Sequence, residues 1–136
     1  MHELFEHTAD IGLRVRARDL DTLFREAAEG LFSMIVEETV PPSGGREFRF
    51  RLVADNREDL LFDWLHELLY TFDTTGVLLG GFEVRVFGET LVATARGTEW
   101  DEATHRPRYE IKAITYHGLR LEPDKGGWLA EVIVDI

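Results

Sequence analysis

The sequence contains no cysteine, so neither a disulfide nor a thiolate metal site is available to it. No apolar run approaches the roughly 20 residues that a membrane-spanning helix needs. The first six residues lack the basic and apolar segments of a secretory signal peptide. Together these absences predict a cytoplasmic protein that has no membrane partner.

Basic residues are also in short supply. Lys and Arg number 15 against 26 Asp and Glu, which gives a net charge of −11. Proteins that follow a nucleic-acid backbone normally carry a basic stripe, because phosphate neutralisation supplies much of their affinity. The sequence shows no such stripe, so we expect no direct nucleic-acid binding. An acidic surface instead favours cations or a basic protein partner.

The motifs of several common enzyme classes are missing as well. None of the histidines has the His-Glu-x-x-His spacing of a zinc hydrolase, and there is no Gly-rich phosphate loop. A Gly-x-Ser-x-Gly nucleophile motif is absent too. The standard hydrolases and nucleotide-binding enzymes are therefore disfavoured.

The length and composition that remain are typical of one globular domain. A chain of 136 residues with 44% hydrophobic and 30% charged residues can bury a substantial core without cross-links. No linker or internal repeat interrupts it. We therefore treat residues 1–136 as a single domain.

Apolar periodicity predicts two helices in the first half of the chain. Leucine, valine and alanine alternate with arginines over residues 13–18, the pattern of a half-buried strand. Asp19 then precedes an amphipathic helix of about four turns over residues 20–35. Asn56 caps a second helix, which Gly76 closes.

The second half of the chain reads mainly as strands. After a strand at 48–52, we expect turns at Gly80-Gly81, at Gly88-Glu89 and over residues 124–127. The strands expected there are 82–87, 91–98, 109–116, 119–122 and 128–134. The pattern predicts an α+β fold: a single compact domain with two amphipathic helices packed on a mostly antiparallel sheet.

A few polar residues stand where a sheet would otherwise be apolar. Asp10 follows a short strand, and Lys112 lies within "YEIKAITYH". The apolar run Val132–Val134 is followed by Asp135 and Ile136, which offer a side-chain carboxylate and a terminal carboxylate. Hard cations such as Ca²⁺ and Mg²⁺ prefer several oxygen ligands of this kind. Asp10 would add a third carboxylate if the first and last strands run side by side.

Each of these residues also has a simpler interpretation. Asp10 suits a turn or cap, Asp135 a frayed terminal charge, and Lys112 a strand lysine that extends to solvent. His7 can bond a backbone group, and Glu67 is expected to face solvent. No single residue decides between these alternatives.

The order of four segments resembles the archease family. They are "HTADIGL" (7–13), "LLFDWLHELLY" (60–70), "IKAITYH" (111–117) and the final "VIVDI" (132–136), and together they span essentially the whole chain. The combination of "HTAD", "IKAITYH" and a final Asp-Ile is the specific part of the match. The loops at 41–46 and 99–108 cannot be matched in the same way.

The resemblance implies a compact α+β accessory protein that is not itself an enzyme. Archeases assist the RtcB-type RNA ligase, which joins tRNA halves and repairs RNA. They promote guanylylation of the ligase by the GTP that the ligase binds, and they allow multiple turnover. A divalent metal is implied, Ca²⁺ before Mg²⁺ or Mn²⁺, with Asp10, Asp135 and Ile136 as ligands. The resemblance also implies that Lys112 is needed for the activity of the protein as a cofactor of the ligase. We expect His7 and Glu67 to contribute to this activity or to the contact with the ligase.

Two other function classes stay open from the residues alone. One is a metal-dependent phosphoester hydrolase that uses His7, Asp10 and Asp135, although no general base with an orienting partner is evident. The other is a plain protein-interaction module, whose binding would survive removal of metal.

Overall fold

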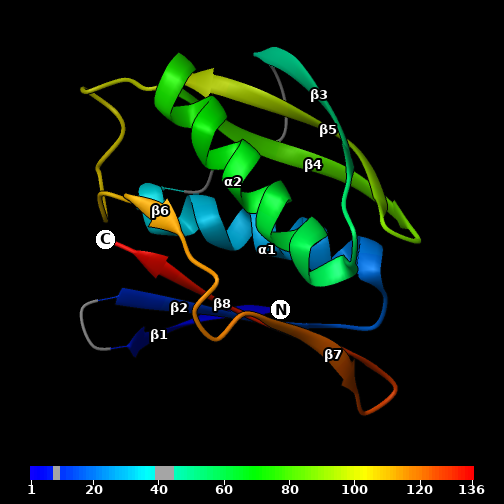
Figure 1. Ribbon diagram of the computed structural model, residues 1–136. Coiled ribbons are helices and arrows are strands. Elements are labelled where there is room, and N and C mark those ends of the chain that lie inside the picture. Colours follow the sequence, from blue (N-terminus) through cyan, green and yellow to red (C-terminus); the bar gives the residue numbers. More distant parts are fainter. Residues whose placement is uncertain (8–9, 39–44) are drawn as a thin grey trace.

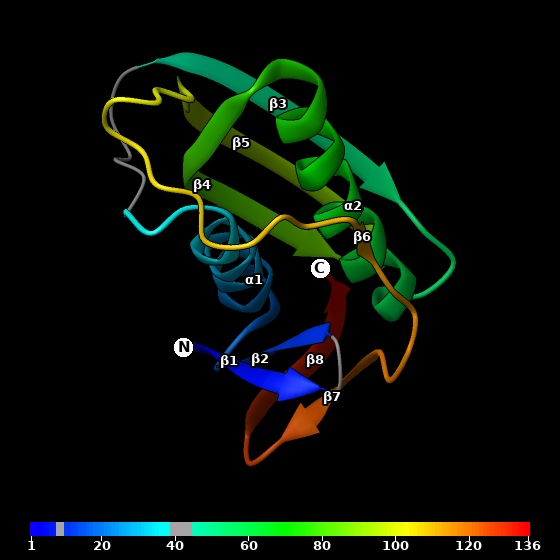
Figure 2. The same ribbon diagram turned by 90° about the vertical axis from the view of Figure 1, so that its left-hand side faces the viewer.

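A computed structural model describes residues 1–7, 10–38 and 45–136, apart from the side chain of His7. In that part of the chain, the strands form two antiparallel sheets, and both helices contact strands of both sheets (Figures 1 and 2). The elements are β1 (His2–His7), β2 (Asp10–Ala17), α1 (Leu20–Ile35), β3 (Arg46–Val53), α2 (Arg57–Thr75), β4 (Val77–Phe87), β5 (Thr90–Glu99), β6 (Ala113–Ile114), β7 (Arg120–Asp124) and β8 (Gly127–Asp135).

The larger sheet joins both ends of the sequence. Its strand order is β1-β2-β8-β6, and β7 also pairs with β8. The smaller sheet has the order β3-β5-β4, with α2 lying across one of its faces (Figure 1). The expected α+β class is therefore confirmed, with the strands divided between two sheets. None of the described helices is long and apolar enough to cross a membrane.

The boundaries of both helices follow the capping signals in the sequence. The Asp19 side chain accepts a hydrogen bond from the Thr22 N–H at 2.8 Å, and Asn56 accepts one from the Asp59 N–H at the same distance. The bond from Thr22 lowers the pKa of Asp19. Gly76 ends α2 in the left-handed region, at φ 71°, where a residue with a Cβ is disfavoured.

One apolar core joins the helices to the inner faces of both sheets. Trp64 of α2 is fully buried, and its indole N–H donates to the Phe24 carbonyl of α1 at 3.0 Å. The ring of Phe50, from β3, meets Trp64 edge-on with centroids 5.3 Å apart. Because each helix has a continuous apolar face, the core positions both sheets against one common layer.

The turn expected at Gly80-Gly81 is wrong. β4 runs continuously from Val77 to Phe87, and its pairing with β5 shifts register between Gly80 and Glu83. The two glycines therefore mark a bulge within a strand, and Gly81 has φ 57°. The turns at Gly88-Glu89 and after Asp124 occur as expected.

The strand expected over 109–116 is mostly wrong, because only Ala113–Ile114 pair as a strand. Before them, the Arg108 and Tyr109 N–H groups donate to the carbonyls of Ile35 and Met34, in the last turn of α1. Those carbonyls have no partner within the helix, so the segment caps α1 before it reaches the sheet. The expected alternation fails too, since Ile114 is buried while Lys112 and Tyr116 are exposed.

Candidate metal centre

Strands β2 and β8 place Asp10 and Asp135 directly opposite each other at one end of the larger sheet. Beyond Asp10, β1 contributes His7 at the matching position, and beyond Asp135, β6 contributes Ala113. Figure 1 shows the end of β8, the start of β2 and strand β6 gathered on this side of the molecule. The condition stated for Asp10 is thus met, because the first and last long strands do run side by side.

The two aspartates share the outer face of the sheet. Their neighbours Ile11 and Val134 are buried in the core, and side chains alternate along a strand. Directly opposed residues on one face have Cβ atoms about 4.5–5.5 Å apart. Asp10 and Asp135 are both half-buried, so two carboxylates are held as neighbours with restricted access to water.

The opposed aspartates form no ion pair with any lysine or arginine of the described residues. Two carboxylates held as neighbours in this way repel each other. A hard divalent cation fits this donor set, because carboxylate oxygens are its preferred ligands and its charge removes the repulsion.

The aspartate pair alone does not complete a coordination shell. Within the described residues, no group of three or more His, Asp or Glu side chains is arranged to hold a metal. Ile136 follows Asp135 directly and packs against the core. A divalent cation held by the pair would therefore need further oxygen ligands.

Lys112 is tied to the same end of the sheet by its backbone. Its N–H donates to the carbonyl oxygen of Asp135 at 2.8 Å, and the next residue, Ala113, is the strand partner of Asp135. The Lys112 side chain is exposed, and its ammonium group makes no ion pair with the described residues. The backbone of an exposed lysine is thus anchored beside the carboxylate pair.

The structure gives the two remaining expected residues different positions. His7 is placed by its backbone opposite Asp10, while its side chain, together with Thr8 and Ala9, lies outside the described residues. Glu67 lies on α2 and is half-buried, not fully solvent-facing. Among the described contacts, none joins Glu67 to Asp10, Asp135 or Lys112.

An aromatic stack beside this region was not singled out from the sequence. The Tyr116 ring stacks on Phe62 of α2 with centroids 3.9 Å apart, and Phe62 stacks in turn on His66 at 5.8 Å. Desolvation raises the pKa of Tyr116, and the Asp59 and Asp63 carboxylates raise it further. The only sequence signal was that Phe62 and Tyr116 fall within two of the matching segments.

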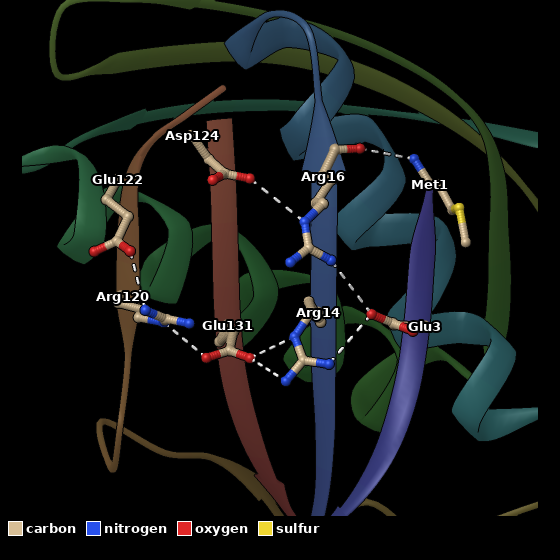
Figure 3. Close-up of polar contacts among 8 residues, drawn as sticks. All are labelled: Met1, Glu3, Arg14, Arg16, Arg120, Glu122, Asp124 and Glu131. Atoms are coloured by element: carbon tan, nitrogen blue, oxygen red, sulfur yellow. Dashed lines mark hydrogen bonds and ion pairs between the residues drawn. The ribbon is translucent and has the colours of Figure 1, made fainter. Parts of the chain in front are cut away.

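The rest of the outer face is neutralised by a network of ion pairs (Figure 3). Glu131 on β8 accepts hydrogen bonds from Arg14 on β2 at 2.6 Å and from Arg120 on β7 at 2.7 Å. Burial opposes ionisation of Glu131, but these two bonds outweigh it and lower the pKa of Glu131. Arg16 pairs with Glu3 and Asp124. The arginines of this strand are therefore paired, in contrast to the two aspartates.

The row between this network and the aspartates is apolar. Gly12 stands opposite Phe5 on one side and Ile133 on the other. A Cβ on Gly12 would lie 2.1 Å from the Phe5 ring, so the absence of a side chain lets Phe5 cover the sheet. Arg14 in turn lies over the Phe5 ring at 4.6 Å. Gly12 of the "HTADIGL" segment therefore provides space for Phe5.

Comparison with known proteins agrees with this architecture. The model of the Archease protein family (MTH1598/TM1083) matches residues 2–136. The chain belongs to the archease family. It is 38% identical over 140 residues to the archease of Methanosarcina mazei, covering 99% of this chain and 95% of that protein. It is 39% identical over 141 residues to the archease of Thermococcus gammatolerans, covering 98% and 97%.

Two solved structures are similar over nearly the full archease chain. The solution structure of protein 1598 of Methanobacterium thermoautotrophicum has a TM-score of 0.86 at 34% identity, covering 99% of this chain and 98% of that one. The crystal structure of an archease from Thermotoga maritima, described as a possible chaperone, has a TM-score of 0.70 at 25% identity. It covers 100% of this chain and 98% of that one.

Proposed function

We propose that this archease-family chain is a metal-binding accessory protein of an RtcB-type RNA ligase. It promotes the GTP-dependent guanylylation of the ligase and its multiple turnover in tRNA splicing and RNA repair, and it forms no bond in the substrate itself. The observation that carries this proposal is the register of β2 and β8, which opposes Asp10 and Asp135 without a described cationic partner.

In this proposal, Asp10, Asp135 and the Ile136 carboxylate hold the cation. A bound Ca²⁺, or Mg²⁺ or Mn²⁺ in its place, supplies a positive charge and open coordination positions for oxygen atoms of a partner. The half-buried positions of both aspartates favour binding, because carboxylates already placed together lose little further freedom when the ion arrives. The sheet therefore supplies a preorganised ligand pair.

Lys112 acts on the partner side of the same region. Its backbone is fixed to Asp135, while its side chain is exposed and makes no ion pair with the described residues. An ammonium group in this position can bind a phosphate or a carboxylate of the ligase. The net charge of −11 complements a basic partner surface, which favours docking to protein over docking to RNA.

The decisive experiment measures guanylylation of the ligase by GTP in the presence of each variant. Asp135→Asn and Asp10→Asn keep the shape of the side chain and remove its charge, so each is expected to lower stimulation at least tenfold. Asp55→Asn is the matched control, because Asp55 is exposed in the loop before α2 and lies outside the larger sheet. Equal stimulation by Asp135→Asn and the wild type would contradict the metal-site proposal.

A chelation experiment separates this proposal from a plain interaction module. Ligase binding by the wild type should weaken in EDTA and recover when Ca²⁺ is added back. Adding a Gly-Ser dipeptide after Ile136 should reduce the recovery, since it moves the terminal carboxylate away from Asp135. Binding that is unchanged in EDTA would favour the interaction module.

A further inference from the structure

Among the described elements, no helix covers the outer face of the β3-β5-β4 sheet (Figure 1). Phe50 and Ala93 are buried on its inner face, which meets α2, so the residues alternating with them point to the opposite side. Strand register places five of these side chains in two adjacent rows. We call this surface the Arg51–Arg85 face: Arg51, Val53, Arg85, Phe87 and Val92.

Large apolar side chains are exposed on this face. Val53 is 66% exposed, Phe87 57% and Val92 41%. Val53 and Phe87 both flank Thr90, and Val92 lies in the next row, so the three form one patch. Contiguous exposed apolar side chains of this kind mark contact surfaces for other proteins.

The two arginines of the face have no charged partner among the described residues. Arg51 and Arg85 stand on either side of Val92 in one cross-strand row. By contrast, nearby Arg49 and Arg96 share Glu47, and the arginines on the outer face of the larger sheet are paired (Figure 3). In a chain of net charge −11, this row is therefore a local positive site.

A hollow continues the face toward α1. Its volume is about 690 Å³, and its lining includes Arg25 and Asp21 of α1 together with Arg85 and Val92. The Asp21 carboxylate accepts a hydrogen bond from the Val86 N–H at 2.7 Å. Glu83 also borders the hollow and accepts a hydrogen bond from the Thr94 hydroxyl at 3.4 Å. The hollow adds depth and a further arginine to an otherwise flat sheet surface.

We propose that the Arg51–Arg85 face docks a protein segment that presents carboxylates beside apolar side chains. The guanidinium groups of Arg51 and Arg85 bind the carboxylates, and apolar side chains of the segment cover Val53, Phe87 and Val92. The surface is separate from the Asp10–Asp135 pair, because the two belong to different sheets. It therefore gives the chain a second contact with a partner, independent of metal.

Charge disfavours the other possible occupants. A second copy also carries −11, and stacking the same face on itself would bring like arginines together. An RNA strand would extend past this short row in a chain of net charge −11, and the patch offers one exposed aromatic ring, Phe87, for base stacking. An acidic protein segment needs only the local positive row.

The test is an NMR titration of the ¹⁵N-labelled full chain with three probes. They are an eight-residue peptide alternating glutamate with leucine, the same peptide with lysine for glutamate, and a twelve-nucleotide uridine RNA. We expect the acidic peptide to shift the amides of β3, β5 and β4 around Val92. Arg51→Glu or Arg85→Glu should weaken binding at least fivefold, and both together at least thirtyfold. Arg106→Glu, the same charge change at an exposed loop position, should change it less than twofold.

The other outcomes overturn the proposal. No shift at millimolar acidic peptide, or equal shifts with the lysine peptide, would show that the arginines do not select carboxylates. Shifts at this face with the RNA alone would assign it to nucleic acid. Concentration-dependent dimers that disappear in Arg85→Glu would assign it to a second copy. Unchanged amide spectra away from the substitution establish that each variant is folded.

Discussion

Tyr116 and Phe62 stack with ring centroids 3.9 Å apart, and this contact joins the segment that carries Lys112 to α2. The segment also bonds to β8, through the strand pairs of Ala113 and Ile114 and through the N–H groups of Lys112 and Thr115. The stack therefore adds a side-chain contact with α2 to the backbone bonds that place this mostly irregular stretch beside Asp135.

Tyr116→Ala should loosen this segment without unfolding the domain. An aromatic pair contributes roughly 0.5–1.5 kcal/mol beyond area burial in double-mutant cycles, so amide exchange at 113–117 should accelerate about three- to tenfold. Hydrogen exchange read by NMR measures this change. Tyr116→Phe keeps the stack and serves as the control. Exchange that is as slow in Tyr116→Ala as in the wild type would show that other contacts position the segment.

Gly12→Ala should destabilise the fold through one specific clash. The new Cβ would lie 2.1 Å from the Phe5 ring, which must then swing off the sheet and leave Arg14. We expect a loss of about 1–2 kcal/mol in the free energy of unfolding, measured in urea. In a Phe5→Ala background the same substitution should lower the free energy of unfolding much less. An equal loss in both backgrounds would show that the Phe5 ring is not what requires a glycine at position 12.

Glu131 should give the stability a distinct dependence on pH. Its pKa is lowered in the folded state by Arg14 and Arg120, so its contribution is fully present above the ordinary value of 4.5. That contribution is lost as the pH falls through the lower folded-state pKa. At pH 7 the free energy of unfolding, measured in urea, should be about 1 kcal/mol higher for the wild type than for Glu131→Gln, and this difference should shrink in acid. A difference that does not change between pH 7 and pH 3 would contradict this account.

The sequence predicted those parts of the fold that local signals determine. Asp19, Asn56 and Gly76 fix helix ends through bonds within a few residues, and each acted as expected. The segment at 109–116 was misjudged because its N–H groups bond to the distant carbonyls of Ile35 and Met34. Apolar alternation gives no information about such partners.

The candidate site shows the same division. The sequence motifs identified Asp10 and Asp135 as candidate metal ligands, but only the register of β2 with β8 shows that they lie opposite each other. The Arg51–Arg85 face required the pairing of three strands, and nothing in the spacing of Arg51 and Arg85 along the chain indicates it. The metal itself, the ligase and the role of Lys112 stay predictions.

The opposed aspartates predict opposite effects of one substitution with and without metal. In EDTA, Asp135→Asn removes a like-charge repulsion and should raise the free energy of unfolding by about 1 kcal/mol. With Ca²⁺ at a hundred times its dissociation constant, the wild type should gain about 2.7 kcal/mol by linkage, and the variant much less. The order of their stabilities should therefore reverse when Ca²⁺ is added.

Thermal and urea unfolding, each measured in EDTA and in Ca²⁺, check this reversal. Asp55→Asn, in the exposed loop before α2, should show the same Ca²⁺ response as the wild type. Asp10→Asn should behave like Asp135→Asn, because each removes one member of the same pair. If the wild type gains nothing from Ca²⁺, Mg²⁺ or Mn²⁺, the pair is not a metal site in the isolated chain. If Asp135→Asn is less stable than the wild type in EDTA, the two carboxylates do not repel each other as their register implies.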